Sequence, residues 1–275
     1  MPTSLPAVRL NLIKNLLALA LLLPLLLLLP WRVGGSGAVL LAASGVVGIA
    51  LGDSLYFAAL RRIGTRRCLT LDAGGPALTA VAGLLWLSEW PSPRQWLGMA
   101  LISLAVLLVA RQRCDAVGEL GPASTGTAGP TAAAQRLGVA LAIGALICGS
   151  AGALLARAAL RADGLEPLQA AALRLAAATL VLLPLLRGLP WSPPRPYPRL
   201  RRWPLWLLAT LLGTSAGIVL QQTALQRLPG ALAVALLATA PVMALPLARL
   251  EGDRPGAIGV LAGLLALAGV SCVVS

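Results

Sequence analysis

Long apolar runs separated by short basic segments make up most of this chain. A membrane hydrocarbon core about 30 Å thick is crossed by about 20 mostly apolar residues in a helix. The runs predict nine such helices, near residues 8–30, 37–60, 68–88, 95–111, 137–158, 166–187, 203–226, 230–250 and 256–274. The pattern therefore favours an all-α protein that crosses a membrane about nine times.

The first of these spans is the weakest, because Arg9, Asn11, Lys14 and Asn15 precede its leucine run. Basic residues before a short apolar stretch are also typical of a secretory signal. No clear small-x-small cleavage motif follows Pro30, and eight further spans argue against secretion. We therefore expect a membrane span here.

A polar stretch divides the chain into two parts. Residues 113–135 are rich in Gly, Pro, Ser, Thr and Ala, which is typical of a linker. Four expected spans precede it in residues 1–112, and five follow it in residues 136–275. We predict one structural repeat on each side of the linker.

The two parts align with each other. Shifts of 160 or 165 residues superpose charged, proline and glycine positions: Lys14 on Arg174, Pro24 on Pro184, Gly48 on Gly213, Gly52 on Gly217, and Pro76 on Pro241. Leucine-rich helices align by chance, but prolines and charges do so rarely, so we infer an internal duplication. Four helices before the linker would invert the second repeat, an architecture typical of alternating-access carriers.

Composition excludes several classes of function. The chain is 58% hydrophobic and 11% charged, with 22 Lys+Arg against 9 Asp+Glu, and its mean hydropathy is +0.87. The basic residues lie in short clusters between apolar runs, which indicates membrane loops rather than a nucleic-acid partner. Histidine is absent and no C-x-x-C pair occurs, so we expect no metal, no cofactor and no His-based catalysis.

Basic residues also indicate orientation. Counted over alternate loops, most of them fall on one side, which predicts a cytoplasmic N-terminus and linker and an outside C-terminus.

Two carboxylates are candidate functional groups, because an ionisable side chain in a membrane costs about 2.5 to 3.5 kcal/mol on insertion scales. Asp53 and Asp72 lie inside neighbouring expected helices, on either side of the basic segment 61–67. Such a pair would share a proton and couple its movement to transport. In the alternative, an arginine of that segment folds back and holds the carboxylates as a structural latch.

Other polar groups in the spans are further candidates for the substrate pathway. Lys14 and Arg174 would contact an anionic group or extend towards the lipid headgroups. Tyr56, Gln221 and Gln222 would bind a polar metabolite or join helices to each other.

Helix-breaking residues mark two places in the expected spans. Gly74, Gly75 and Pro76 weaken one helix, and Pro241 repeats the break in the second half. Such breaks are tolerated where they line a cavity, so we place a central cavity beside them. Ordinary proline kinks are the alternative.

These motifs resemble the EamA family of the drug/metabolite transporter (DMT) superfamily. The matching pieces are the run Gly52-Asp53-Ser54-Leu55-Tyr56-Phe57-Ala58-Ala59-Leu60, then Arg62-Ile63-Gly64, Pro76, Glu89, Gly98, Ala224-Leu225, Pro241, Glu251 and the glycine-rich last helix. The resemblance implies two fused inverted repeats in a ten-helix fold that would here lack its first helix. It also implies that both termini are cytoplasmic, in contrast to the charge count.

The expected function is that of a secondary transporter that exports a small metabolite or drug-like compound by alternating access. Protons would drive it through Asp53, since the sequence has no Walker A motif. The expected setting is the plasma (inner) membrane, with the lipid bilayer, substrate and protons as partners; a homodimer is compatible with the sequence. The alternative is a non-transporting scaffold or lipid-handling protein. An intramembrane aspartyl protease is disfavoured, because Leu71-Asp72 and Gly52-Asp53 do not fit its Tyr-Asp and Gly-x-Gly-Asp motifs.

Overall fold

The chain is helical throughout the part that this computed structural model describes, namely residues 6–30, 34–111, 132–163, 165–185, 208, 210–243 and 257–274. Within these residues no strand occurs. Six helical stretches there are long and apolar enough to cross a membrane: Ala7–Leu27, Gly35–Asp72, Pro93–Arg111, Ala132–Arg161, Pro167–Leu185 and Ala257–Val274. Two shorter apolar helices are Gly75–Leu87 and Gly230–Met243. The predicted all-α, multi-pass fold is confirmed.

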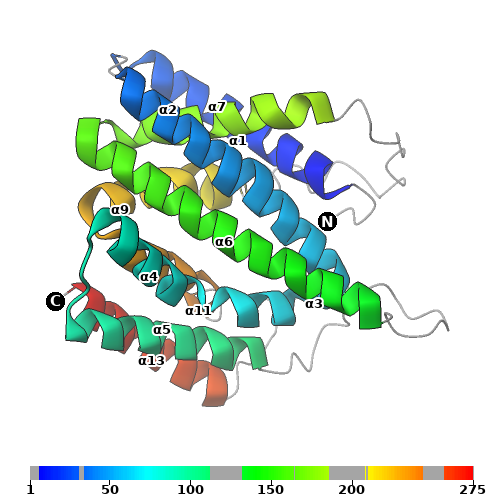
Figure 1. The fold of residues 1–275 in the computed structure, drawn as a ribbon, viewed down its shortest axis with the longest axis vertical. Helices are drawn as coiled ribbons and strands as arrows, with labels where there is room; N and C mark the ends of the chain where they lie inside the picture. The colour runs from blue at the N-terminus through cyan, green and yellow to red at the C-terminus, as the bar shows by residue number, and fades with distance from the viewer. Residues whose placement is uncertain are drawn as a thin grey trace. The chain divides into compact units, whose positions relative to one another are not determined.

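Figure 1 shows the helices in chain order from blue to red. They are α1 (Ala7–Leu27), α2 (Gly35–Ser44), η1 (Gly45–Asp53), α3 (Ser54–Asp72), α4 (Gly75–Leu87), α5 (Pro93–Arg111), α6 (Ala132–Asp163), α7 (Pro167–Leu185), η3 (Leu211–Ala216), α9 (Gly217–Arg227), α10 (Gly230–Ala238), α11 (Ala240–Met243) and α13 (Ala257–Val274). The two segments labelled η are π-helices, whose turns are wider than those of an α-helix.

The helices form two compact units, and each unit combines segments from before and after the linker. The first unit consists of Met1–Phe57 and Ala151–Leu228, and the second of Ala58–Ser150 and Pro229–Ser275. Most of the linker 113–135 lies outside the described residues. The repeat boundaries at residues 112 and 136 stay a prediction. Compact units are defined by contacts between residues, and such units need not coincide with duplicated segments of the sequence.

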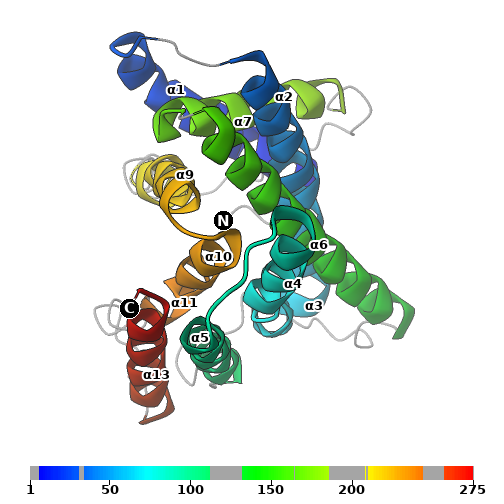
Figure 2. The same ribbon diagram turned by 60° about the vertical axis from the view of Figure 1, so that its left-hand side comes forward.

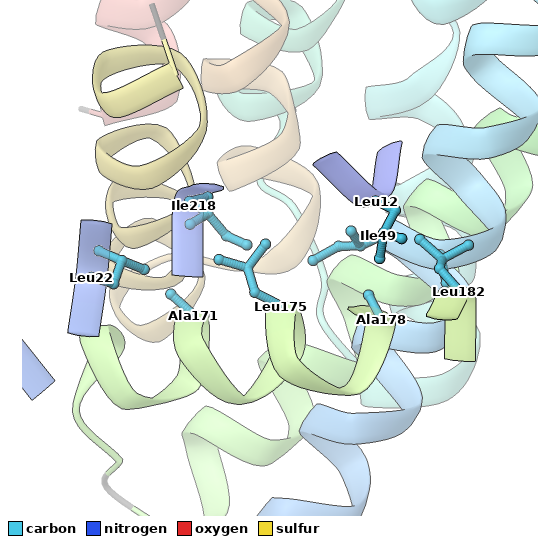
Figure 3. Packing of buried hydrophobic residues seen from close by; sticks show 10 residues of the cluster. Leu12, Leu22, Ile49, Ala171, Leu175, Ala178, Leu182 and Ile218 are labelled. Atoms are coloured by element: carbon cyan, nitrogen blue, oxygen red, sulfur yellow. The ribbon is translucent and has the colours of Figure 1, made fainter. Parts of the chain in front are cut away.

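In the first unit, α1, η1, α7 and α9 pack around one apolar cluster. Figure 3 shows the cluster residues pointing at one another from these helices: Leu12, Leu22, Ile49, Ala171, Leu175, Ala178, Leu182 and Ile218. Leu12 lies near Leu182, and Leu22 lies near Ala171. Helices α1 and α7 therefore run antiparallel, and the middle of α1 faces the middle of α7.

In the second unit, α5 and α13 lie side by side, as Figure 2 shows. Their contact depends on glycines. A Cβ atom at Gly98 would lie 2.7 Å from the carbonyl oxygen of Gly269, and one at Gly269 would lie 2.8 Å from that of Gly98. At the start of α5, Ser92 and Gln95 form a reciprocal capping box, with bonds of 3.3 and 2.8 Å. Small residues such as Gly98 and Gly269 allow helix backbones to approach this closely in a membrane.

This contact predicts a strong effect of one methyl group. Gly98→Ala should destabilise the protein by about 1 to 3 kcal/mol, because the new Cβ overlaps backbone atoms that cannot move away easily. Gly263→Ala is the matched control on α13, where nothing lies within 4 Å of the added Cβ. Chemical unfolding in detergent micelles measures both. Equal stability of the two variants would contradict the close contact.

Two helices meet inside the expected loop. The basic segment 61–67 was expected to connect two spans, and within it α3 consists of two helices that meet at a kink at Gly64, with φ 76° and ψ 167°. Glycine adopts positive φ readily, so the chain bends at this one residue. Arginine is a good helix former, and the residues on both sides of the bend therefore stay helical.

Candidate functional site

Buried polar side chains are concentrated in the first unit. Of the fourteen in the described part of the chain, eleven belong to this unit: Arg9, Asn11, Asn15, Ser44, Arg157, Gln169, Arg174, Thr179, Thr210, Ser215 and Gln222. Among its described residues, the second unit has only the hydroxyl groups of Thr79, Ser150 and Thr239. All the buried amide and charged side chains thus belong to one unit, which makes its interior the candidate site.

Asp53 forms an ion pair with Lys14. The Lys14 Nζ atom donates a hydrogen bond to Asp53 Oδ2, and it lies 5.7 Å from the centre of the Phe57 ring. The two side chains of the pair are 24% and 36% exposed, so the pair is only partly shielded from its surroundings. Since Lys14 comes from α1 and Asp53 ends η1, the pair ties these two helices together.

Arg174 is the most deeply buried charged side chain among the described residues, at 3% exposure. Its backbone packs directly on Gly45, where any Cβ atom would overlap the Arg174 carbonyl. Its guanidinium interacts electrostatically with Asp53, but Nε and Nη1 have no hydrogen-bond partner. Of the two cations, Lys14 and Arg174, only Lys14 forms an ion pair with Asp53.

Two asparagines of α1, one helical turn apart, were missed as site residues by the sequence analysis. The Asn11 amide donates to the Ile49 carbonyl oxygen at 2.8 Å and to Ser54 Oγ at 3.1 Å, while its Oδ1 has no partner. Asn15 is fully buried with both amide atoms unpartnered. Their i, i+4 spacing, which puts both on one helix face, is the sequence signal for them.

On α9, Gln222 is fully buried, and neither its nitrogen nor its oxygen has a partner. It follows Ile218 of the apolar cluster by one turn. Gln221 is half-buried on the same helix. Tyr56 is half-buried on α3, with its ring centre 6.5 Å from that of Phe57.

The two π-helical segments occupy equivalent positions of the repeat. Subtracting 165 from Leu211–Ala216 gives residues 46–51, which fall inside Gly45–Asp53. Such segments are rare and are frequently found at functional sites. Of the aligned glycines, Gly48, Gly52 and Gly213 lie in these segments, and Gly217 directly follows the second one. Gly48 also packs closely, because a Cβ at Gly152 would lie 2.6 Å from Gly48 Cα.

In the second unit, helix breaks occur near both predicted positions. Helix α3 ends at Asp72 and α4 begins at Gly75, with Pro76 in its first turn, where a missing N–H leaves no bond unmade. Pro241 lies in the short helix α11, which follows α10 after Thr239. Asp72 is exposed. The cavity expected beside these breaks stays a prediction.

Glu89 has a structural contact. Its carboxylate accepts a 2.7 Å hydrogen bond from the backbone N–H of Gly230, the first residue of α10. An acidic group at a helix N-terminus satisfies a free N–H and suits the helix dipole. Glu251, which the family resemblance also includes, lies outside the described residues.

Known proteins were compared with this chain at the level of sequence family and of fold. The EamA-like transporter family matches residues 1–111 and 136–275. A protein known from a crystal structure is 17% identical and has a TM-score of 0.73, with 98% of this chain and 88% of that chain covered, which shows a shared fold. The search among curated proteins found no match. Because the family match covers nearly the whole chain, this protein belongs to the EamA-like transporter family of the DMT superfamily.

Proposed function

We propose that this protein is a secondary carrier of the inner membrane that exports a small polar metabolite or drug-like solute by alternating access, coupled to protons. Membership of a transporter family supports a DMT-type transporter in general and is consistent with a chain that is not an enzyme. One observation carries the finer proposal. Seven buried nitrogen and oxygen atoms of Asn11, Asn15, Arg174 and Gln222 have no hydrogen-bond partner.

Unpartnered buried polar atoms are costly, at about 1 to 3 kcal/mol each. A protein that only holds others in place, or a lipid-handling protein, would be more stable with apolar groups at these positions. A carrier needs such atoms, because its solute must find partners in the interior and leave them again. The polar interior of the first unit therefore favours a carrier over a scaffold.

Asp53 is the proposed coupling site. It is half-buried, whereas Glu166, the other acidic residue of the first unit whose side chain is described, is exposed. Protonation would remove the negative charge that attracts both Lys14 and Arg174 and so loosen the contact between α1 and η1. Protonation of Asp53 and binding of the solute would then influence each other, which is the requirement for coupled transport.

The remaining candidates keep secondary roles in this proposal. Tyr56 and Gln221 are half-buried and would line the solute pathway. Asp72 is exposed and would serve as a second proton-carrying carboxylate.

Counterflow in liposomes tests whether the protein is a carrier. The purified full chain is reconstituted, the liposomes are preloaded with unlabelled amino acids, nucleobases, sugars or cationic drugs, and entry of the same labelled pool is followed. A carrier accelerates entry when its solute waits on the other side, so at least one pool should enter several-fold faster than into empty proteoliposomes. If no preloaded pool accelerates entry, the scaffold alternative is favoured.

A further inference from the structure

We propose that the transported solute carries a single anionic group, a carboxylate, and that Arg174 binds this group. The inference rests on the proposed carrier function and adds to it the chemical class of the solute. It is carried by the charges and the unpartnered donors in the interior of the first unit.

Around Asp53, in the described part of the chain, there are two positive side chains and one negative side chain, so one positive charge has no ion-pair partner. Lys14 and Arg174 are both near Asp53, but only Lys14 forms the ion pair. Arg157, another buried arginine, is satisfied by the carbonyl oxygens of Leu225 and Gln226, at 2.7 and 2.8 Å, near the C-terminus of α9. A positive charge is favourable at such a helix end. A buried charge such as that of Arg174, which forms no ion pair with the described residues, is strongly unfavourable, and a monoanion would neutralise it.

The donors of Arg174 suit a carboxylate. Its Nε and Nη1 atoms are buried and unpartnered, and the planar guanidinium matches the two oxygens of a carboxylate. Asn15 and Gln222 supply further unpartnered amide groups from α1 and α9.

These three side chains come from helices that pack on the same apolar cluster. Arg174 follows Ala171 by three residues, Asn15 follows Leu12 by three, and Gln222 follows Ile218 by four, and all three preceding residues belong to that cluster. Spacings of three and four residues place each polar side chain on the same helix face as its cluster residue.

Other solute charges fit this environment less well. A cation would meet two positive side chains, and the one carboxylate is already held by Lys14. A neutral solute would leave the charge of Arg174 uncompensated. A lipid phosphate is the other source of an anion, but Arg174 lies seven residues inside the start of α7, roughly 10 Å at the rise of an α-helix.

Ligand-induced stabilisation tests the proposal without relying on transport. The full chain in phosphatidylcholine nanodiscs is heated with acetate, benzoate, phenylacetate or alanine, and with the primary amide that matches each acid. At least one carboxylate should stabilise the protein at an about tenfold lower concentration than its amide, as expected for hydrogen bonds to a charged group. In Arg174→Gln the preference should fall to within about twofold. Arg174→Lys, which keeps the charge, should retain part of it and serves if Arg174→Gln does not fold.

Arg227→Gln is the matched control, because Arg227 is exposed at the end of α9; it should keep the full preference. Equal stabilisation by acids and amides in the wild type, or a preference that survives in Arg174→Gln, would overturn the proposal. So would an Arg174-dependent stabilisation by phosphatidylglycerol alone, which would make a lipid the anion.

If solutes exchange in counterflow without any preference for carboxylates, only this inference fails; if none exchanges at all, the carrier function itself fails.

Discussion

Replacement of Asp53 by asparagine should abolish the accumulation of solute driven by a proton gradient. Asparagine has nearly the same shape and keeps an oxygen that accepts from Lys14, but it neither binds a proton nor carries a negative charge. With the gradient present, uptake against a concentration difference should therefore fall at least about tenfold, to the level of simple equilibration. A tenfold loss corresponds to about 1.4 kcal/mol of lost coupling free energy.

Proteoliposomes with an imposed pH gradient and a labelled solute that passes the counterflow test provide the measurement. Asp53→Glu keeps an ionisable carboxyl group and should retain part of the accumulation. Size-exclusion profiles and thermal midpoints establish that each variant is folded. Full accumulation by folded Asp53→Asn would remove Asp53 from the coupling mechanism.

The Lys14–Asp53 pair should show a large energetic coupling between its two members. Lys14→Met leaves Asp53 without its ion-pair partner, and Asp53→Asn leaves Lys14 without the carboxylate that it binds. Breaking one side of a fully buried pair costs about 3 to 5 kcal/mol. The pair is partly exposed, so about 1 to 2 kcal/mol is the expected coupling.

A double-mutant cycle of chemical unfolding in detergent measures this coupling. The double variant Lys14→Met/Asp53→Asn should be more stable than the sum of the two single effects predicts, since it lacks both members of the pair. It should nevertheless show no proton-driven accumulation. If the effects of the two single variants add exactly in the double variant, the pair does not form. If the double variant accumulates solute, the Lys14–Asp53 pair has only a structural role.

Hydropathy predicted the fold class of this protein, because twenty apolar residues in a row have few alternatives to a membrane helix. Even the weakest span, with Lys14 and two asparagines near its start, is a helix from Ala7 to Leu27. The segment 61–67 was expected to connect two spans, and the break between two helices does lie in it, at Gly64. The residues around Gly64 are helical although they are charged, because local charge does not determine helix geometry.

The candidate site was only partly visible in the sequence. Asp53, Arg174 and Gln222 stood out, because charged and amide groups are rare within apolar runs. Asn15 did not, since it lies near the basic start of the chain, where polar residues are common. The partner of Asp53 depends on how α1 packs against η1, which is a tertiary contact that no spacing along the chain specifies.

The π-helical segments were also beyond prediction from sequence. The repeat alignment paired their glycines, Gly48 with Gly213 and Gly52 with Gly217. Gly48 packs closely against Gly152, and the Ser44 hydroxyl donates to the Gly152 carbonyl at 2.5 Å. The wider turn of a π-helix follows from the hydrogen-bond pattern of the folded backbone, which composition alone does not reveal.

Measurement of the pH inside proteoliposomes is the most direct test of the central claim, that Asp53 couples solute movement to protons. Proteoliposomes containing a pH-sensitive dye are presented with each solute pool, first with the wild type and then with folded Asp53→Asn. The wild type should show a change of internal pH only when its solute is added, and Asp53→Asn should show none while still exchanging solute. Solute exchange by the wild type with no change of internal pH would contradict proton coupling through Asp53.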